Sequence, residues 1–207
     1  LATMGFTRED AKKFIAQAAE AGHPRARAEQ LSDDIYRASR EAQEKEAGAG
    51  VPGPRGGMGR MVVSDEQVKT MQDLLKSGDP GVINELRNIL ASTWRDSAVQ
   101  LGPERETVDA RAMMAALQLL GCDLGTPCDG NSPSVLSRCA NQGQCAASTL
   151  PDQVYYYDAS PHQAQLVERY RQSLLDMMRS GDFSNLRVAR GVQNAGNVFM
   201  FSSNRGP

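Results

Sequence analysis

Apolar residues recur three and four positions apart along most of this chain, and that spacing places them on one face of an α-helix. The first run consists of Ala11, Phe14, Ile15 and Ala18. Thr7 precedes it as a helix N-cap, Asp10 stands in the first turn, and Gly22 follows as a stop. The pattern therefore predicts a helix between Thr7 and Gly22 with these four residues on one face.

A second helix is predicted from Pro24, because proline suits the first helical position. Its apolar face is followed by alternating charges at 40–46, which indicate a solvated surface. The order helix, glycine, cap, proline, helix recurs around Gly78-Asp79-Pro80, after a helix that Ser64 opens. We interpret the chain as irregular helical hairpins, either a degenerate TPR/Sel1-like repeat or a bundle. Such punctuation is also common in any α-helical protein, so the repeat stays one of two alternatives.

The second half shows three further predicted helices, and the fold class that follows is all-α with a disulfide-rich loop segment. One helix runs from about Glu106 to Leu120, a short one from Ser132-Pro133 to Cys139, and a long one from Ser160-Pro161. Three shorter features are less regular. Trp94 lies near the end of the helix that begins at Pro80. Tyr155-Tyr156-Tyr157 is compatible with an extended segment, and Val198-Phe199-Met200-Phe201 is compatible with a strand or a docked apolar tail.

Glycine and proline divide the chain into four regions. The stretch 48–59 is too poor in apolar residues to pack as an element, which is typical of a linker or long loop. The regions are listed in chain order: an N-terminal hairpin at 1–47, the linker at 48–63, a helical domain at 64–191 with a disulfide segment at 122–145, and an apolar tail at 192–207.

Composition narrows the possible partners. The 207 residues are 40% hydrophobic but only 5% aromatic, so the core is built from aliphatic residues and methionine. We expect Met113-Met114 and Met177-Met178 on buried helix faces. The formal net charge of −2, with signs alternating along the chain, argues against a nucleic-acid partner. No apolar run approaches the length of about 20 residues that spans a membrane.

Four cysteines lie in one loop-rich stretch, spaced Cys122-x5-Cys128-x10-Cys139-x5-Cys145. An even number of cysteines in such a stretch favours two disulfides in an oxidising compartment, in one of three pairings. A zinc site is the rival interpretation, although its ligands usually stand two to four residues apart, and free thiols are a third.

The cysteine stretch also carries a resemblance. It reads Leu119-Leu120-Gly121-Cys122-Asp123-Leu124-Gly125, then Cys128, then Leu136-x-x-Cys139-Ala140-x-x-Gly143-x-Cys145. In this it resembles a group of uncharacterised exported, disulfide-containing helical proteins of Xanthomonas-like gammaproteobacteria. The resemblance covers residues 66–181 and extends to 10–38, but not to the loop at 48–59. It implies export and disulfides, and it implies no activity.

Catalytic signatures are missing from the sequence. No Gly-x-Ser-x-Gly elbow accompanies His23 or His162, and no Gly-Lys-Ser/Thr follows the glycines at 48–59. The carboxylate pairs Asp33-Asp34 and Glu104/Glu106 lie in polar surroundings that are typical of a solvated face. We therefore assign no catalytic residue, metal ligand or cofactor.

These observations favour an exported, non-enzymatic protein that binds another protein through its helical surface, in the periplasm, at the envelope or outside the cell. Two alternatives stay open. One is a helical hydrolase of cell-wall or glycan material, which requires a cleft that collects carboxylates with raised pKa values. The other is a secreted effector or toxin-associated factor.

Overall fold

The computed structural model describes residues 7–48, 61–92 and 97–191. Most of the glycine-rich stretch, Trp94 and the tail at 192–207 lie outside the described residues, and so do the predictions made for them. The described elements follow in this order: α1 (Arg8–Glu20), α2 (Pro24–Gly48), α3 (Asp65–Leu75), α4 (Pro80–Leu90), β1 (Ser97–Leu101), β2 (Glu106–Thr107), α5 (Ala110–Asp123), α6 (Pro133–Gln142), α7 (Leu150–Gln153), the π-helix η1 (Val154–Asp158), α8 (Pro161–Ser180) and β3 (Leu186–Arg190).

Helix starts follow the capping signals of the sequence. Thr7, Ser64 and Ser160 each accept a hydrogen bond from the backbone N–H three residues on, and the side chain there accepts one from the backbone N–H of the cap. Pro80 and Pro161 occupy the first positions of α4 and α8. The predicted starts of α1, α3, α4 and α8 are therefore confirmed.

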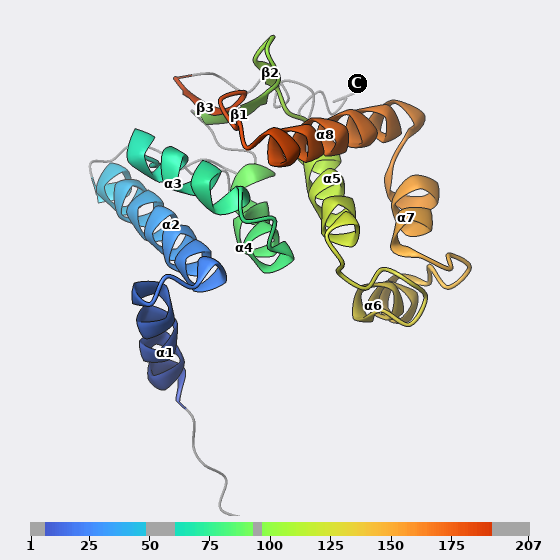
Figure 1. Cartoon of the computed structure of the whole chain (residues 1–207), viewed down its shortest axis with the longest axis horizontal. Helices are drawn as coiled ribbons and strands as arrows, with labels where there is room; N and C mark the ends of the chain where they lie inside the picture. The colour runs from blue at the N-terminus through green and yellow to red at the C-terminus, as the bar shows by residue number, and fades with distance from the viewer. Residues whose placement is uncertain (1–6, 49–60, 93–96, 192–207) are drawn as a thin grey trace, which may run out of the picture.

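The hydrophobic core lies where α2, α3, α4, α5 and α8 meet, and we call these five helices the helical body (Figure 1). α4 packs against both α2 and α5, and α5 packs along α8. The largest side chains that are shielded from solvent in this body are aliphatic: Ile35, Met71, Leu75, Leu86, Ile89, Leu90, Met113, Leu117, Leu119, Leu120 and Leu174. Burying each of them contributes about 1.5–3 kcal/mol, so apolar burial is what stabilises this part of the chain.

Residues just before α3 belong to the same core. Met61 and Val63 are buried, and the Val62 N–H donates to Ser39 Oγ of α2 at 2.9 Å. The sequence pattern placed these residues in the linker, whereas the structure packs them against α2.

The apolar face of α1 is only partly covered, and the exposed fraction of Phe14 on that face is 60%. α1 packs on α2, and Ala19 is the one residue of α1 that is buried. In Figure 1, α1 hangs from the helical body as an arm. A helix covered mainly along one line cannot bury an apolar face of full width.

A small sheet corrects the all-α fold class to a mostly helical one. β1 is its central strand, and it pairs antiparallel with β2 and β3, with Val99 opposite Val188. The helix predicted from Glu106 was wrong at its start, because Glu106 belongs to β2 and α5 begins only at Ala110. Asp109 is the N-cap there, since its Oδ1 accepts from the Ala112 N–H at 2.8 Å.

Tyr155-Tyr156-Tyr157 is not extended, so that prediction was wrong. These residues form η1, which continues directly from α7. The helical turn begins at Thr149, whose Oγ1 accepts from the Asp152 N–H at 3.2 Å. Once this cap has started a helix, the tyrosines continue it with the wider π spacing, which is often found at functional sites.

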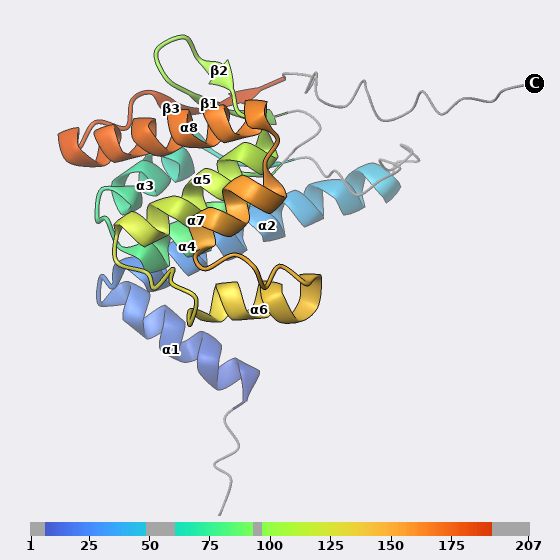
Figure 2. The same ribbon diagram turned by 90° about the vertical axis from the view of Figure 1, so that its right-hand side faces the viewer.

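The described chain forms an arch, with α1 as one arm and α6 with α7 as the other (Figure 1). The quarter-turned view in Figure 2 shows α1 and α6 at the same end of the molecule, and the sheet at the opposite end beside α8. Among the described helices, none combines the length and the apolar character that crossing a membrane requires.

Candidate functional site

The four cysteines form two disulfides, Cys122–Cys128 and Cys139–Cys145, with S–S distances of 1.98 and 2.01 Å. Of the three possible pairings, the structure has the one in which each cysteine is bonded to the cysteine six residues away. Because all four sulfur atoms are bonded in pairs, they are not available as zinc ligands. Within the described residues, no group of three or more His, Cys, Asp or Glu side chains is arranged to hold a metal ion.

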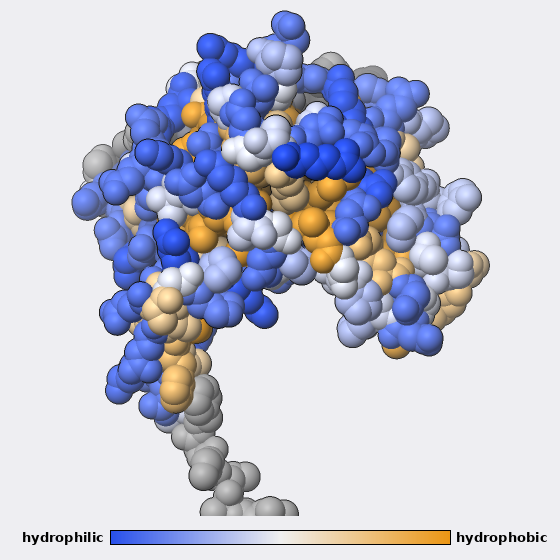
Figure 3. Space-filling view, viewed as in Figure 1, coloured by the Kyte–Doolittle hydropathy of each residue, from blue (hydrophilic) through white to orange (hydrophobic). Residues whose placement is uncertain are grey.

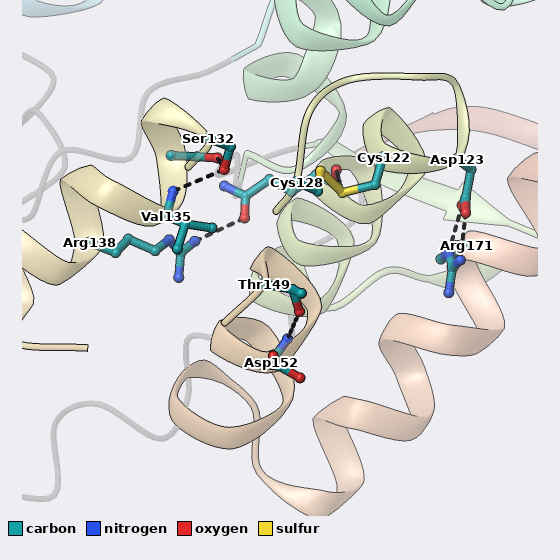
Figure 4. The surroundings of a disulfide bond; sticks show 11 residues. Cys122, Asp123, Cys128, Ser132, Val135, Arg138, Thr149, Asp152 and Arg171 are labelled. Atoms are coloured by element: carbon teal, nitrogen blue, oxygen red, sulfur yellow. Dashed lines mark hydrogen bonds and ion pairs between the residues drawn. A yellow bond between two sulfur atoms is a disulfide. The ribbon is translucent and has the colours of Figure 1, made fainter. Parts of the chain in front are cut away.

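The first disulfide attaches the end of α5 to the segment that follows it (Figure 4). The Cys128 carbonyl accepts from the Leu150 N–H at 2.8 Å, and Asp129 forms a β-bridge with Thr149. Next to this bridge, a Cβ added to Gly130 would lie 3.1 Å from the Ser148 carbonyl oxygen. Glycine therefore allows the two chain segments to approach each other closely here. The chain between Cys128 and α7 is thereby closed into a loop that carries α6.

The second disulfide closes the C-terminal end of α6. Gly143 ends this helix in the left-handed conformation, with φ of 72°, and its N–H donates to the Cys139 carbonyl at 3.1 Å. Cys139 directly follows Arg138, so the disulfide limits the movement of Arg138, which contacts Gln118 and Asp158.

Arg138 connects α6 to two other elements. Its Nη2 donates to Gln118 Oε1 of α5 at 3.0 Å, and its Nη1 forms an ion pair with the carboxylate of Asp158, at the end of η1. Gln144 Nε2 also lies 3.4 Å from Asp158 Oδ1. These contacts hold the segment 124–158, which we call the wall segment, beside α5.

A buried amide makes the second internal connection of the wall segment. Gln153 is fully buried, and its Nε2 donates to the carbonyl oxygens of Val135 at 3.2 Å and Gln144 at 3.4 Å. It thereby ties α7 to both ends of α6. A buried polar group that donates to two carbonyls fixes relative position, because moving it would leave those groups unpaired.

At the same C-terminal end of α5, α8 is held by an ion pair with two contacts. Arg171 Nε and Nη2 each lie 2.6 Å from a carboxylate oxygen of Asp123, which neighbours Cys122 (Figure 4). The hydrogen bond to Asp123 raises the pKa of Arg171 above its usual range. Glu168 accepts from Gln172, Tyr155 and Arg171, and these hydrogen bonds lower the pKa of its carboxyl group despite partial burial.

These contacts leave a groove of about 360 Å³ between α5, the wall segment and the start of α8. Much of its lining is apolar and small: Ala91, Ala110, Ala112, Ala115, Ala159, Met114 and Val167. Polar side chains complete it: Arg111, Gln118, Arg138, Asp158 and Gln163. In Figure 3, apolar surface gathers over α5 directly below α8 and extends toward α7.

A second face of α5 lines the groove. Arg111, Met114, Ala115 and Gln118 stand at positions i, i+3, i+4 and i+7, which is one stripe of a helix. The opposite face of α5, with Met113 and Leu117, is buried in the core. The prediction that Met113-Met114 lies on a buried helix face is thus confirmed for Met113 and confirmed in part for Met114, which packs against the core and is partly exposed in the groove.

A second groove, of about 550 Å³, lies between α1 and α2. It is charged: Arg8, Lys12, Glu29, Asp33, Asp34 and Arg37 line it. Burial raises the pKa of Glu29, and the negative charges of Glu85 and Asp33 raise it further. Asp34 is neutralised by an ion pair with Arg37.

The remaining residues considered for catalysis lie apart from both grooves. His23 is exposed between α1 and α2, where its carbonyl accepts from the Arg27 N–H at 3.0 Å, as a helix start requires. His162 is exposed in the first turn of α8. Glu104 is exposed beside β2, and Glu106 pairs with Arg169 at 2.8 Å.

Sequence patterns missed Met114, Arg111 and Gln118 as a group. The signal that reveals them is the second stripe on α5, whose spacing is as regular as that of the buried face.

Comparison with known proteins adds no relative: no protein-family model matches this chain, and neither the curated proteins nor the solved structures contain a match to it.

Proposed function

We propose that this chain is an exported, non-enzymatic protein that binds a partner protein, and that the groove between α5, the wall segment and α8 is its binding site. The observation that carries the proposal is the second face of α5, which lines the groove with apolar side chains between Arg111 and Gln118. Met114 and Ala115 remain partly exposed there, although they belong to a helix whose other face is deeply buried. A concave apolar surface with a few polar groups at its edges is a common form of binding site.

The wall segment supports the same proposal. Two disulfides, a buried amide and the contacts of Arg138 hold it in place. A rigid wall lowers the entropy that binding costs, because the site is formed before the partner arrives. Disulfides persist in oxidising compartments, which supports export.

The helical hairpins α1–α2 and α3–α4 support a repeat-like arrangement that presents an extended surface. We place them in the proposal as the scaffold that positions α5, since α4 packs against both α2 and α5.

Photo-crosslinking tests the proposal. A photoreactive amino acid at position 115, in the groove, should yield a discrete adduct with a partner in the envelope fraction of the producing organism. The matched control places the same group at Gln172, which is exposed on α8 away from the groove lining. Met114→Arg should abolish the adduct at 115. Adducts of equal yield at both positions, or an adduct that survives Met114→Arg, would contradict groove binding.

A glycan hydrolase is the second candidate, and the groove between α1 and α2 favours it. Burial raises the pKa of Glu29, which is the direction that a general acid requires, and Asp33 lies one turn along the same helix. Release of soluble fragments from peptidoglycan tests it. Release that Glu29→Gln abolishes, while the exposed-site control Glu41→Gln retains it, would support this candidate over the first. No release by the unaltered protein would remove it.

A further inference from the structure

The groove is asymmetric in charge. Among its lining residues, Arg138 is matched by Asp158, whereas Arg111 has no carboxylate partner in the described part of the chain. The lining therefore carries a net positive charge, although the whole chain has a formal charge of −2. A partner that enters this groove meets an unpaired guanidinium beside an apolar floor.

The position of Arg111 strengthens this asymmetry. It stands in the first turn of α5, where the helix dipole favours a negative charge and disfavours a positive one. The side chain of the N-cap Asp109 is already engaged with the Ala112 N–H, and the Arg111 side chain is exposed. A carboxylate placed next to Arg111 would be stabilised both by the guanidinium and by the helix terminus.

The floor of the groove suits side chains of a polypeptide. Alanines from α4, α5 and the stretch before α8 make it broad, and Met114 gives it an adaptable thioether surface. Short alanine side chains allow a second backbone to approach closely. Gln118 and Gln163 also line the groove. Their amide oxygens accept from Arg138 and from the Ser160 N–H, so it is their amide N–H groups that can donate to peptide carbonyls.

We infer that the partner segment is an acidic peptide, in which an apolar side chain fills the alanine and methionine floor and an Asp or Glu carboxylate pairs with Arg111. This inference rests on the proposed function and specifies its ligand. Arg111 acts mainly on recognition and on the rate of association, since a charge at the rim steers the approach of a charged partner.

Selection from a displayed library of random peptides on the immobilised protein tests the inference. The unaltered protein should enrich peptides in which Leu, Met or Phe stands near Asp or Glu. A synthetic copy of an enriched peptide should bind Arg111→Glu at least about tenfold more weakly, because attraction becomes repulsion. Selection on Arg111→Glu itself should enrich Lys or Arg in place of the acid.

The matched control is Arg179→Glu. It carries the same charge change on the exposed C-terminal turn of α8, twelve residues beyond Val167 of the groove. It should leave both the enriched sequences and the affinity unchanged. Arg111 and Arg179 are both exposed, so neither change should disrupt the fold. The thermal unfolding midpoint should rise slightly for Arg111→Glu and fall slightly for Arg179→Glu, because a negative charge suits the first turn of a helix and not the last. Small opposite shifts of this kind exclude a folding defect as the cause of weaker binding by Arg111→Glu.

The possible failures are distinguishable. Peptides that lose binding in Met114→Arg but show no preference for acids would overturn the inference and leave the groove as the binding site. Peptides whose binding does not depend on Met114 would overturn both. Saturable binding of dodecanoate that Met114→Arg abolishes, with no peptide enriched, would assign the groove to a lipid acid and overturn the peptide.

Discussion

The helical body and the wall segment are adjacent, yet they are stabilised in different ways. The body buries long aliphatic side chains from five helices in one continuous cluster. In the wall segment the buried apolar side chains are few, namely Val135, Ala147, Leu150 and Val154, and all but Ala147 lie at the margin of the body's cluster. Two disulfides and a buried amide supplement them. The groove lies between these regions, so its shape depends on the weaker one.

The largest effect is expected in the body. Leu120→Ala removes a side chain with no exposure to solvent and leaves a cavity, so the free energy of unfolding should fall by about 2–5 kcal/mol. Leu136→Ala is the matched control, since Leu136 of α6 is 52% exposed and its truncation should change stability by less than about 0.5 kcal/mol. Urea denaturation measures both. Equal losses would mean that a buried side chain of the body contributes no more to stability than an exposed one of α6, and would contradict the stated difference between the two regions.

The next effect concerns the disulfides. Replacing Cys122 and Cys128 together by serine removes a constraint worth about 2 kcal/mol for so short a loop. We expect the loss to be local, because the body does not depend on this bond. Amide hydrogen exchange should accelerate in the wall segment and stay slow in α4 and α5. Faster exchange throughout the chain would show that the wall segment and the body unfold as one unit.

A smaller effect is expected from Arg138→Ala. It removes the contacts to Gln118 and Asp158 and should cost the wall segment about 1–2 kcal/mol of local stability, measured by hydrogen exchange in α6. Arg169→Ala is the control, because its pair with Glu106 is half-exposed and contributes at most about 1 kcal/mol. If the control matches Arg138→Ala, then Arg138 does not hold the wall.

The smallest effect is a dependence on pH. Hydrogen bonds lower the pKa of Glu168 in the folded protein, so its stabilising contribution is complete above the unfolded value of about 4.5. That contribution is lost as the pH falls through the lowered folded value. Stability of the unaltered protein should therefore fall more steeply below pH 4.5 than that of Glu168→Gln. Parallel pH profiles would mean that the hydrogen bonds of Glu168, including the one from Tyr155 of η1, do not stabilise the fold.

The helices could be predicted because their signals are local. A capping box such as Ser160 with Gln163 lies within four residues, and a buried face repeats within a few turns. The sheet could not, because β1 finds β3 almost ninety residues later. The helix predicted from Glu106 illustrates the difference, since pairing of β2 with β1 outweighs the local pattern.

The cysteines and the groove differ in the same way. Their close spacing allowed two disulfides to be predicted, although not their pairing. The apolar neighbours of Met114 predict that it packs against the core, as it does, but they do not predict that the groove beside α6, η1 and α8 leaves part of it exposed. The exposure of Phe14 has a similar origin, since it depends on how little of α1 is covered.

The central claim is that the wall segment, held by its disulfides, completes a binding groove on a body that folds without them. The most direct measurement is a fluorescence titration of a groove-selected peptide against the unaltered protein and a variant with all four cysteines changed to serine. The account predicts that the variant keeps its helical circular dichroism and cooperative unfolding but loses most of its affinity for the peptide. Unchanged affinity in the variant would contradict it.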